Sequence, residues 1–283
     1  MRFGLIVALG LVLCGAADGG AFAGRAGLIA FSRTSTGAQT TLVTVDPATG
    51  AVHTLGAASE PAWSPDGSRL AYVRNGQVYV ADAKGTGETL VAAGQDPAWS
   101  PDGTRLVLAE YDGKAQAGHP LGTLQLVVVD LATGAPTQLT DSSVDVRFPA
   151  WSPDGATIAF ATPNALGTLP AAGGAARPLD VPGVAIDGGP SWSPDGSRLA
   201  FLDSGGQVWT AAPDGGGARQ LTYMLGAPPA ANLDARPAWS PDGSAIAFTS
   251  GADLCVADLG GTVRRVTRSP QTATPVLAAF TDW

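Results

Sequence analysis

The sequence is poor in the residues from which metal and acid–base centres are usually built. Its 283 residues include only 2 histidines and 2 cysteines, and 14% are charged, against about 25% in an average protein. Two isolated histidines cannot form a three-histidine metal centre. The net charge of −8 makes nucleic acid an improbable partner, because no basic surface would neutralise its phosphates.

The common catalytic motifs are missing as well. The chain contains no Gly-x-Ser-x-Gly elbow, no His-Glu-x-x-His pair and no glycine-rich phosphate loop. We therefore predict no catalytic residue, no bound metal and no cofactor.

Turn-forming residues, in contrast, are abundant. The 38 glycines and 22 prolines make up roughly a fifth of the chain, and 45% of all residues are hydrophobic. So much apolar sequence argues against disorder. Glycine and proline scattered at this density favour many short strands joined by tight turns over long helices.

The first 23 residues have the pattern of an export signal. Arg2 precedes an apolar run from Phe3 to Leu13, and Ala21-Phe22-Ala23 is a small-residue cleavage site. The run is too short to span a bilayer, and no other stretch is long enough. Cys14 could anchor a lipoprotein, but the large Leu13 before it disfavours this. The prediction is a periplasmic or secreted bacterial protein with a mature domain from residue 24 to 283.

A repeat fills that domain. The pentapeptide Trp-Ser-Pro-Asp-Gly occurs five times, at intervals of 36, 52, 41 and 47 residues, starting at Trp63, Trp99, Trp151, Trp192 and Trp239. The chain also ends on a sixth tryptophan, Trp283, without the turn. A period near 40 residues marks propellers or solenoids, and helical periodicity is absent.

Each repeat predicts one four-stranded propeller blade. In the unit from residue 97 the expected strands are 97–99, 105–110, 124–130 and 137–140. Before the first full unit, residues 28–55 supply three strands, and residues 278–283 supply one more. We expect these to complete a sixth blade, so that the last strand lies beside the first and closes the ring.

The repeated segment Pro-Ala-Trp-Ser-Pro-Asp-Gly resembles the propeller of the TolB family of exported bacterial proteins, over about residues 27–283. The resemblance implies an all-β, six-bladed propeller built from this WD40-like repeat. TolB itself carries an α/β domain before its propeller, for which residues 23–28 leave no room. A role in the Tol–Pal envelope system is therefore not implied.

The repeat residues have structural explanations that compete with functional ones. Tryptophan can stack on sugars, but one at the same place in every blade is better explained as a packing wedge between sheets. The motif aspartates lack the alternating oxygen ligands of a calcium loop and fit turn chemistry. The arginines that recur after the turn, such as Arg69 and Arg105, are expected to form ion pairs at blade edges. Cys255 is expected to be a small core residue.

Function is predicted on the face that carries the connections of variable length. These are the segments 111–122, 141–148, 180–189 and 223–236, whereas the Ser-Pro-Asp-Gly turns on the opposite face are short and uniform. We expect the mouth of the central channel and its rim to be formed by the following candidate ligand- or partner-binding residues: Glu60, Asp96, Arg147, Asp187, Arg236, His119, Tyr111 and Tyr223.

Two classes of function remain open. The first is a monomeric, non-catalytic scaffold that binds an envelope or extracellular protein or peptide. The second is an enzyme of the lyase or lactonase type that holds a divalent metal at the channel mouth with Asp96, Asp187 and His119. The scarcity of histidine favours the first.

Overall fold

The computed structural model describes residues 29–33, 40–45, 52–114, 121–141, 145–163, 165–186, 188–223, 236–240, 242–250 and 253–265. Within these ranges the chain forms 23 β-strands and no helix. No apolar helix of membrane-spanning length occurs in this part of the chain. The first 23 residues lie outside it, so the export signal, its cleavage site and Cys14 stay predictions.

The strands form six antiparallel sheets in chain order. The first three sheets contain β1 (Ile29–Arg33), β2 (Thr41–Val45) and β3 (Val52–Ala57); β4 (Ser59–Trp63), β5 (Arg69–Arg74), β6 (Gln77–Asp82) and β7 (Thr89–Ala93); and β8 (Gln95–Trp99), β9 (Arg105–Tyr111), β10 (Leu124–Asp130) and β11 (Pro136–Gln138). The last three sheets contain β12 (Arg147–Trp151), β13 (Thr157–Ala161), β14 (Leu166–Pro170) and β15 (Arg177–Leu179); β16 (Ser191–Trp192), β17 (Leu199–Leu202), β18 (Val208–Ala211) and β19 (Arg219–Gln220); and β20 (Ala238–Trp239), β21 (Ala245–Ser250), β22 (Asp253–Asp258) and β23 (Val263–Arg265).

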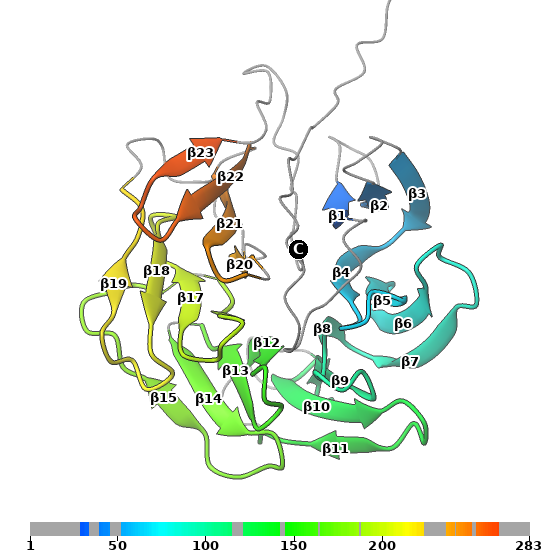
Figure 1. Ribbon diagram of the computed structural model, residues 1–283. Coiled ribbons are helices and arrows are strands. Elements are labelled where there is room, and N and C mark those ends of the chain that lie inside the picture. Colours follow the sequence, from blue (N-terminus) through cyan, green and yellow to red (C-terminus); the bar gives the residue numbers. More distant parts are fainter. Residues whose placement is uncertain are drawn as a thin grey trace, which may run out of the picture.

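These sheets are arranged as blades around a common centre, with the first strand of each blade innermost and the last at the perimeter (Figure 1). Neighbouring inner strands contact one another in order, from β4 and β8 to β12, β16 and β20. The predicted all-β propeller of four-stranded blades is thereby confirmed. The first blade has three described strands, and residues 278–283, which we expect to complete it, lie outside the described ranges.

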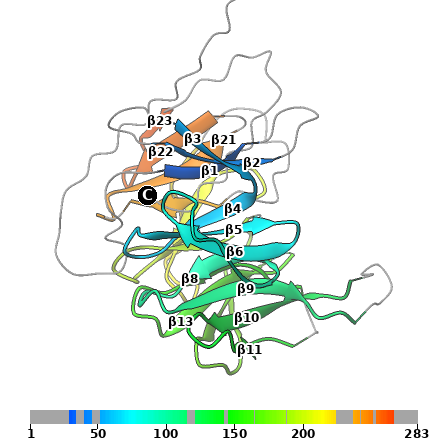
Figure 2. The same ribbon diagram turned by 90° about the vertical axis from the view of Figure 1, so that its right-hand side faces the viewer.

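Backbone hydrogen bonds define the two faces of the ring. On the loop face, the connections between the second and third strands bond to connections that join successive blades, as in Gly94 N–H to Gly76 O (2.9 Å) and Ser204 N–H to Ala185 O (2.7 Å). On the turn face, the third-to-fourth connections bond to the motif turns, as in Ala83 N–H to Ser68 O (3.0 Å). The β9–β10 hairpin extends along the axis of the ring, on the loop face (Figure 2).

The motif turns are held together by their own side chains. In the turn after β8, the Ser100 hydroxyl donates to Asp102 Oδ1 (2.5 Å) and accepts from the Arg105 N–H (2.9 Å), while Gly103 adopts a φ of 68°. In the equivalent turn, hydrogen bonds from Ser64 and Ser68 lower the pKa of Asp66 to about 2. The carboxylates of these turns therefore serve the turn, as turn chemistry predicts.

Successive motif turns also contact each other. A Cβ placed on the glycine of each later turn would lie 3.6–3.8 Å from the proline Cδ of the turn before it. This holds for Gly103 against Pro65, Gly155 against Pro101, Gly196 against Pro153 and Gly243 against Pro194. The turn face is thus a continuous chain of proline–glycine contacts from blade to blade.

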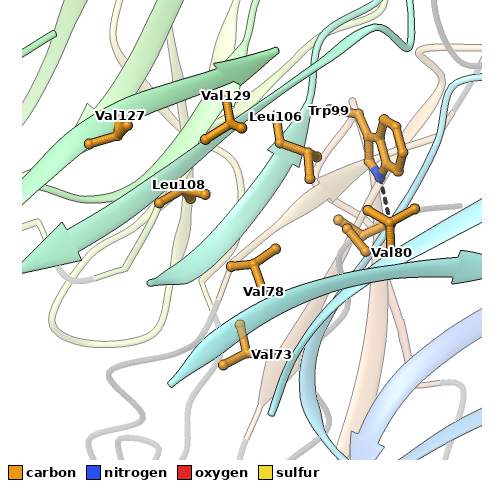
Figure 3. Packing of buried hydrophobic residues seen from close by; sticks show 10 residues of the cluster. Val73, Val78, Val80, Trp99, Leu106, Leu108, Val127 and Val129 are labelled. Atoms are coloured by element: carbon orange, nitrogen blue, oxygen red, sulfur yellow. Dashed lines mark hydrogen bonds between the residues drawn. The ribbon is translucent and has the colours of Figure 1, made fainter. Parts of the chain in front are cut away.

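Each described motif tryptophan is buried between its own blade and the preceding one. Trp99 is 4% exposed and packs among Val78, Val80 and Leu106, and its indole N–H donates to Ala62 O of the preceding blade (2.9 Å) (Figure 3). The other four occupy the same place in the neighbouring clusters. Burial of a large aromatic ring at every interface accounts for their periodic recurrence.

Of the two recurring arginines Arg69 and Arg105, Arg105 forms the expected ion pair, whereas Arg69 contacts the next blade through a tryptophan ring and a backbone carbonyl. Arg69 stacks over the Trp99 ring (4.5 Å) and donates to Gly103 O (2.6 Å), so it bridges two blades. Arg105 stacks over Trp151 (4.9 Å) and approaches Asp102 at 3.5 Å. Stacking on a tryptophan face adds cation–π attraction, which the spacing alone did not indicate. Cys255 is fully buried, as predicted.

Candidate functional site

Three of the inner strands, β4, β8 and β12, begin with a bulge that gives one residue of each an unusual backbone conformation. Glu60, Asp96 and Phe148, each three residues before a motif tryptophan, have φ values of 52°, 55° and 52°. The strand pairing shifts register at these points, between residues 59 and 62, 95 and 98, and 147 and 150. We name the residue three before each motif tryptophan the ring position; its members are Glu60, Asp96, Phe148, Gly189 and Arg236.

A relay of hydrogen bonds links ring positions of successive blades. The Glu60 N–H donates to Ser32 Oγ of β1 (3.1 Å), and the Glu60 carboxylate accepts from the Asp96 N–H (2.6 Å). The Asp96 carboxylate in turn accepts from the Phe148 N–H (3.3 Å). The side chains of Glu60 and Asp96 thus each accept a hydrogen bond from the backbone N–H of the next bulge. These bonds help to stabilise the left-handed conformation at three non-glycine residues.

An ion pair crosses the centre of the ring. Arg236 Nη2 lies 2.5 Å from Asp96 Oδ1, and the two side chains are 13% and 4% exposed. Asp96 belongs to the third sheet and Arg236 precedes β20 of the sixth, so the pair joins blades on opposite sides of a six-unit ring. Buried charges of this kind need a partner, because the loss of hydration is otherwise uncompensated.

The guanidinium of Arg236 is fixed by more than its charge. Its carbon lies 4.8 Å from the centre of the Phe148 ring. At Gly189 an added Cβ would lie 2.4 Å from Phe148 Cβ and 3.2 Å from Arg236 Cδ, so only glycine fits this ring position. The ring positions of three blades therefore pack directly on one another.

The structure brings together three of the predicted rim residues: Glu60, Asp96 and Arg236. Arg147 lies one residue before the ring position, at the start of β12, where it pairs with Ala161. Asp187 and His119 lie outside the described residues.

Two ring positions, Phe148 and Gly189, escaped the sequence reasoning, which looked for charged residues near each inner strand. Counting three residues back from every motif tryptophan would have found both.

The two predicted aromatic residues of the rim lie on the loop face. Tyr111 ends β9, pairs with Leu124 and is 42% exposed. Tyr223 follows β19 and is 75% exposed. Both rings are therefore open to solvent on the face that carries the variable connections.

The described residues do not provide a metal site. Among them, no group of three or more histidine, cysteine, aspartate or glutamate side chains could hold a metal ion. Of the two acids at the ring position, Asp96 is paired with Arg236 and Glu60 accepts from the Asp96 backbone.

Antiparallel blades around a common centre, with a buried tryptophan at each of the five interfaces that the described residues form, define this chain as a β-propeller. Family models narrow the class further. The model of the TolB β-propeller domain matches residues 17–168 and 123–278, and the chain belongs to that family.

Solved structures agree with this assignment. TolB from Acinetobacter baumannii matches with a TM-score of 0.70 at 21% identity, over 91% of this chain and 67% of that one. The putative TolB from Agrobacterium tumefaciens matches with a TM-score of 0.64 at 20% identity, over 85% and 89%. Similarity at this level of identity shows the fold. The comparison with curated proteins finds no significant match.

An enzyme shares the fold as well. An oligogalacturonate lyase in complex with manganese matches with a TM-score of 0.64 at 21% identity, over 89% of this chain and 77% of that one. The described residues of this chain do not fit such a metal, because the acids at the ring centre are engaged by an arginine and a backbone donor. No reaction step through a metal follows from this structure.

Proposed function

We propose that the chain is an exported, non-catalytic propeller that binds a protein or peptide segment of the bacterial cell envelope with its loop face. The observation that carries the proposal is the asymmetry of the two faces. The turn face consists of copies of one short turn, whose serine and aspartate side chains hydrogen-bond within the turn itself. The loop face, in contrast, carries the variable connections and the exposed rings of Tyr111 and Tyr223.

The chemistry of the site supports binding over catalysis. Asp96 is nearly buried and held by Arg236, so it is a poor general base or metal ligand. The remaining candidates of the enzyme alternative, His119 and Asp187, lie outside the described residues, and no observation favours that alternative. Membership of the TolB propeller family and the apolar N-terminal segment support a periplasmic or secreted location. We expect a monomer.

Site-specific photo-crosslinking in cells tests the proposal. A photoreactive amino acid placed at Tyr111 or Tyr223 should give a discrete crosslinked product with an envelope protein. The same amino acid at Leu259, which is 43% exposed in the β22–β23 turn of the opposite face, is the matched control and should give none. Products from position 259 alone, or from none of the three positions, would contradict the loop face as the binding surface.

We propose further that residues 278–283 complete the first blade and close a six-bladed ring. The sixth sheet suggests the register, since Trp239 pairs with Ile246 and Ala238 with Ala247. Alignment of β1 with β21 then pairs Trp283 with Ile29 and Asp282 with Ala30. The closing strand would cover the inner edge of β1, which the first sheet needs to leave no free edge.

Hydrogen exchange tests the closure. The backbone amides of residues 279–283 should exchange as slowly as those of β4 and β8, because they are paired with β1. Exchange of these amides at the rate of an unstructured peptide would rule out the closing strand.

A further inference from the structure

We propose that Arg236 is a built-in counter-ion for the buried carboxylate of Asp96 at the centre of the ring, and that it keeps a divalent cation from that carboxylate. The inference concerns the ring position itself. It does not depend on which partner the loop face binds.

The charge arrangement around Arg236 is the first argument. The Asp96 side chain is 4% exposed, and the Glu60 carboxylate lies 2.6 Å from the backbone nitrogen of Asp96. The Glu60 contact is with the backbone of Asp96, so the buried Asp96 carboxylate is the group that needs a positive charge beside it. Without a cation its desolvation would be uncompensated. Arg236 supplies such a charge, in direct contact with the Asp96 oxygen.

The anchoring of the guanidinium is the second argument. Arg236 approaches from the opposite side of the ring, lies over the Phe148 ring (4.8 Å) and has its stem against Gly189. The glycine at that ring position leaves the space that the arginine stem and Phe148 occupy. Three blades therefore contribute to holding the positive charge at one point, beside the buried oxygen of Asp96.

Carboxylate oxygens are also what calcium and manganese prefer, and a manganese-binding lyase shares this fold. An arginine in contact with the buried acid excludes such an ion by charge and by volume. The melting temperature of the wild-type chain should consequently not change when divalent cations are added. Removal of the arginine should leave the buried Asp96 carboxylate without this counter-ion, so that a divalent cation can bind beside it weakly.

Thermal unfolding of the full chain tests both halves of the proposal. CaCl₂ or MnCl₂ at 10 mM should move the wild-type melting temperature by less than about 1 °C relative to NaCl of equal ionic strength. In EDTA the Arg236→Met variant should have a lower melting temperature than wild type. Either salt should raise that melting temperature by about 3 °C or more, as binding with millimolar affinity requires. If Arg236→Met is unfolded in EDTA, the cation should restore its far-ultraviolet circular dichroism.

Three further variants make the outcome specific. Arg219→Met removes an exposed arginine of β19 and should show no cation response. Arg236→Lys keeps the charge and should show none either. Arg236→Met combined with Asp96→Asn should lose the gained response. A wild-type chain that gains stability from calcium or manganese would overturn the proposal, and so would an Arg236→Met variant that neither folds nor gains stability with them.

Discussion

Replacing Asp96 with alanine should destabilise the folded ring by about 3–5 kcal/mol, because Arg236 is left buried without a partner. The Asp96 side chain is 4% exposed and also accepts the Phe148 N–H, so two buried donors lose their acceptor. For a chain of this size the melting temperature should fall by about 10 °C. Calorimetry or fluorescence-detected unfolding measures the change.

A double-mutant cycle separates the ion pair from simple truncation. Asp96→Ala with Arg236→Met should cost clearly less than the sum of the two single variants, because neither charge is then stranded. Arg74 serves as the surface comparison, since its pair with Glu88 is about one-third exposed (36% and 32%); Arg74→Met should cost much less than Asp96→Ala, because solvent screens the exposed pair. Equal costs for Asp96→Ala and Arg74→Met would argue against a buried cross-ring pair.

Trp99→Ala should have an effect of similar size, about 3–5 kcal/mol. The ring of Trp99 is 4% exposed between two blades, its N–H donates to Ala62 O, and Arg69 stacks on its face. Truncation opens a cavity at the interface and removes the ring on which Arg69 stacks. Chemical denaturation, with the slope compared between variants, gives the free energy of unfolding.

Trp209 provides the matched control for that experiment. It is a tryptophan outside the motif, in β18, and is only partly buried, with its N–H donated to Asp203 (2.8 Å). Trp209→Ala should cost less than Trp99→Ala, and Trp99→Phe should fall between wild type and Trp99→Ala. A Trp99→Ala variant as stable as Trp209→Ala would refute the wedge role.

The repeat made most of the fold predictable. Five copies of one pentapeptide set the blade spacing, and local chemistry places strands on either side of a proline–aspartate–glycine turn. The third strand of the unit from residue 97 was predicted as 124–130 and is Leu124–Asp130. The other strand ends moved by one or two residues: β8 begins at Gln95, and β11 ends at Gln138. Such ends depend on pairing with the neighbouring strand, which composition does not encode.

The site was less predictable than the fold. Sequence reasoning placed Glu60, Asp96 and Arg236 near one another, but it treated them as charges open to a partner. That Asp96 and Arg236 bind each other across the ring is a contact between residues 140 positions apart, and only the arrangement of the blades around a common centre creates it. The left-handed bulge that orients Glu60 and Asp96 is likewise set by strand pairing and the relay of hydrogen bonds.

The proline–glycine contacts of the turn face have a consequence for how such a ring can change. Each motif turn lies beside the next, and the Arg69 guanidinium of one turn donates to Gly103 O of the following turn (2.6 Å), so the turn face helps to hold neighbouring blades at a fixed spacing. The variable connections lie on the opposite, loop face. They can lengthen, shorten or exchange their sequence while the ring keeps its pitch, so new binding loops could be grafted there without redesign of the frame.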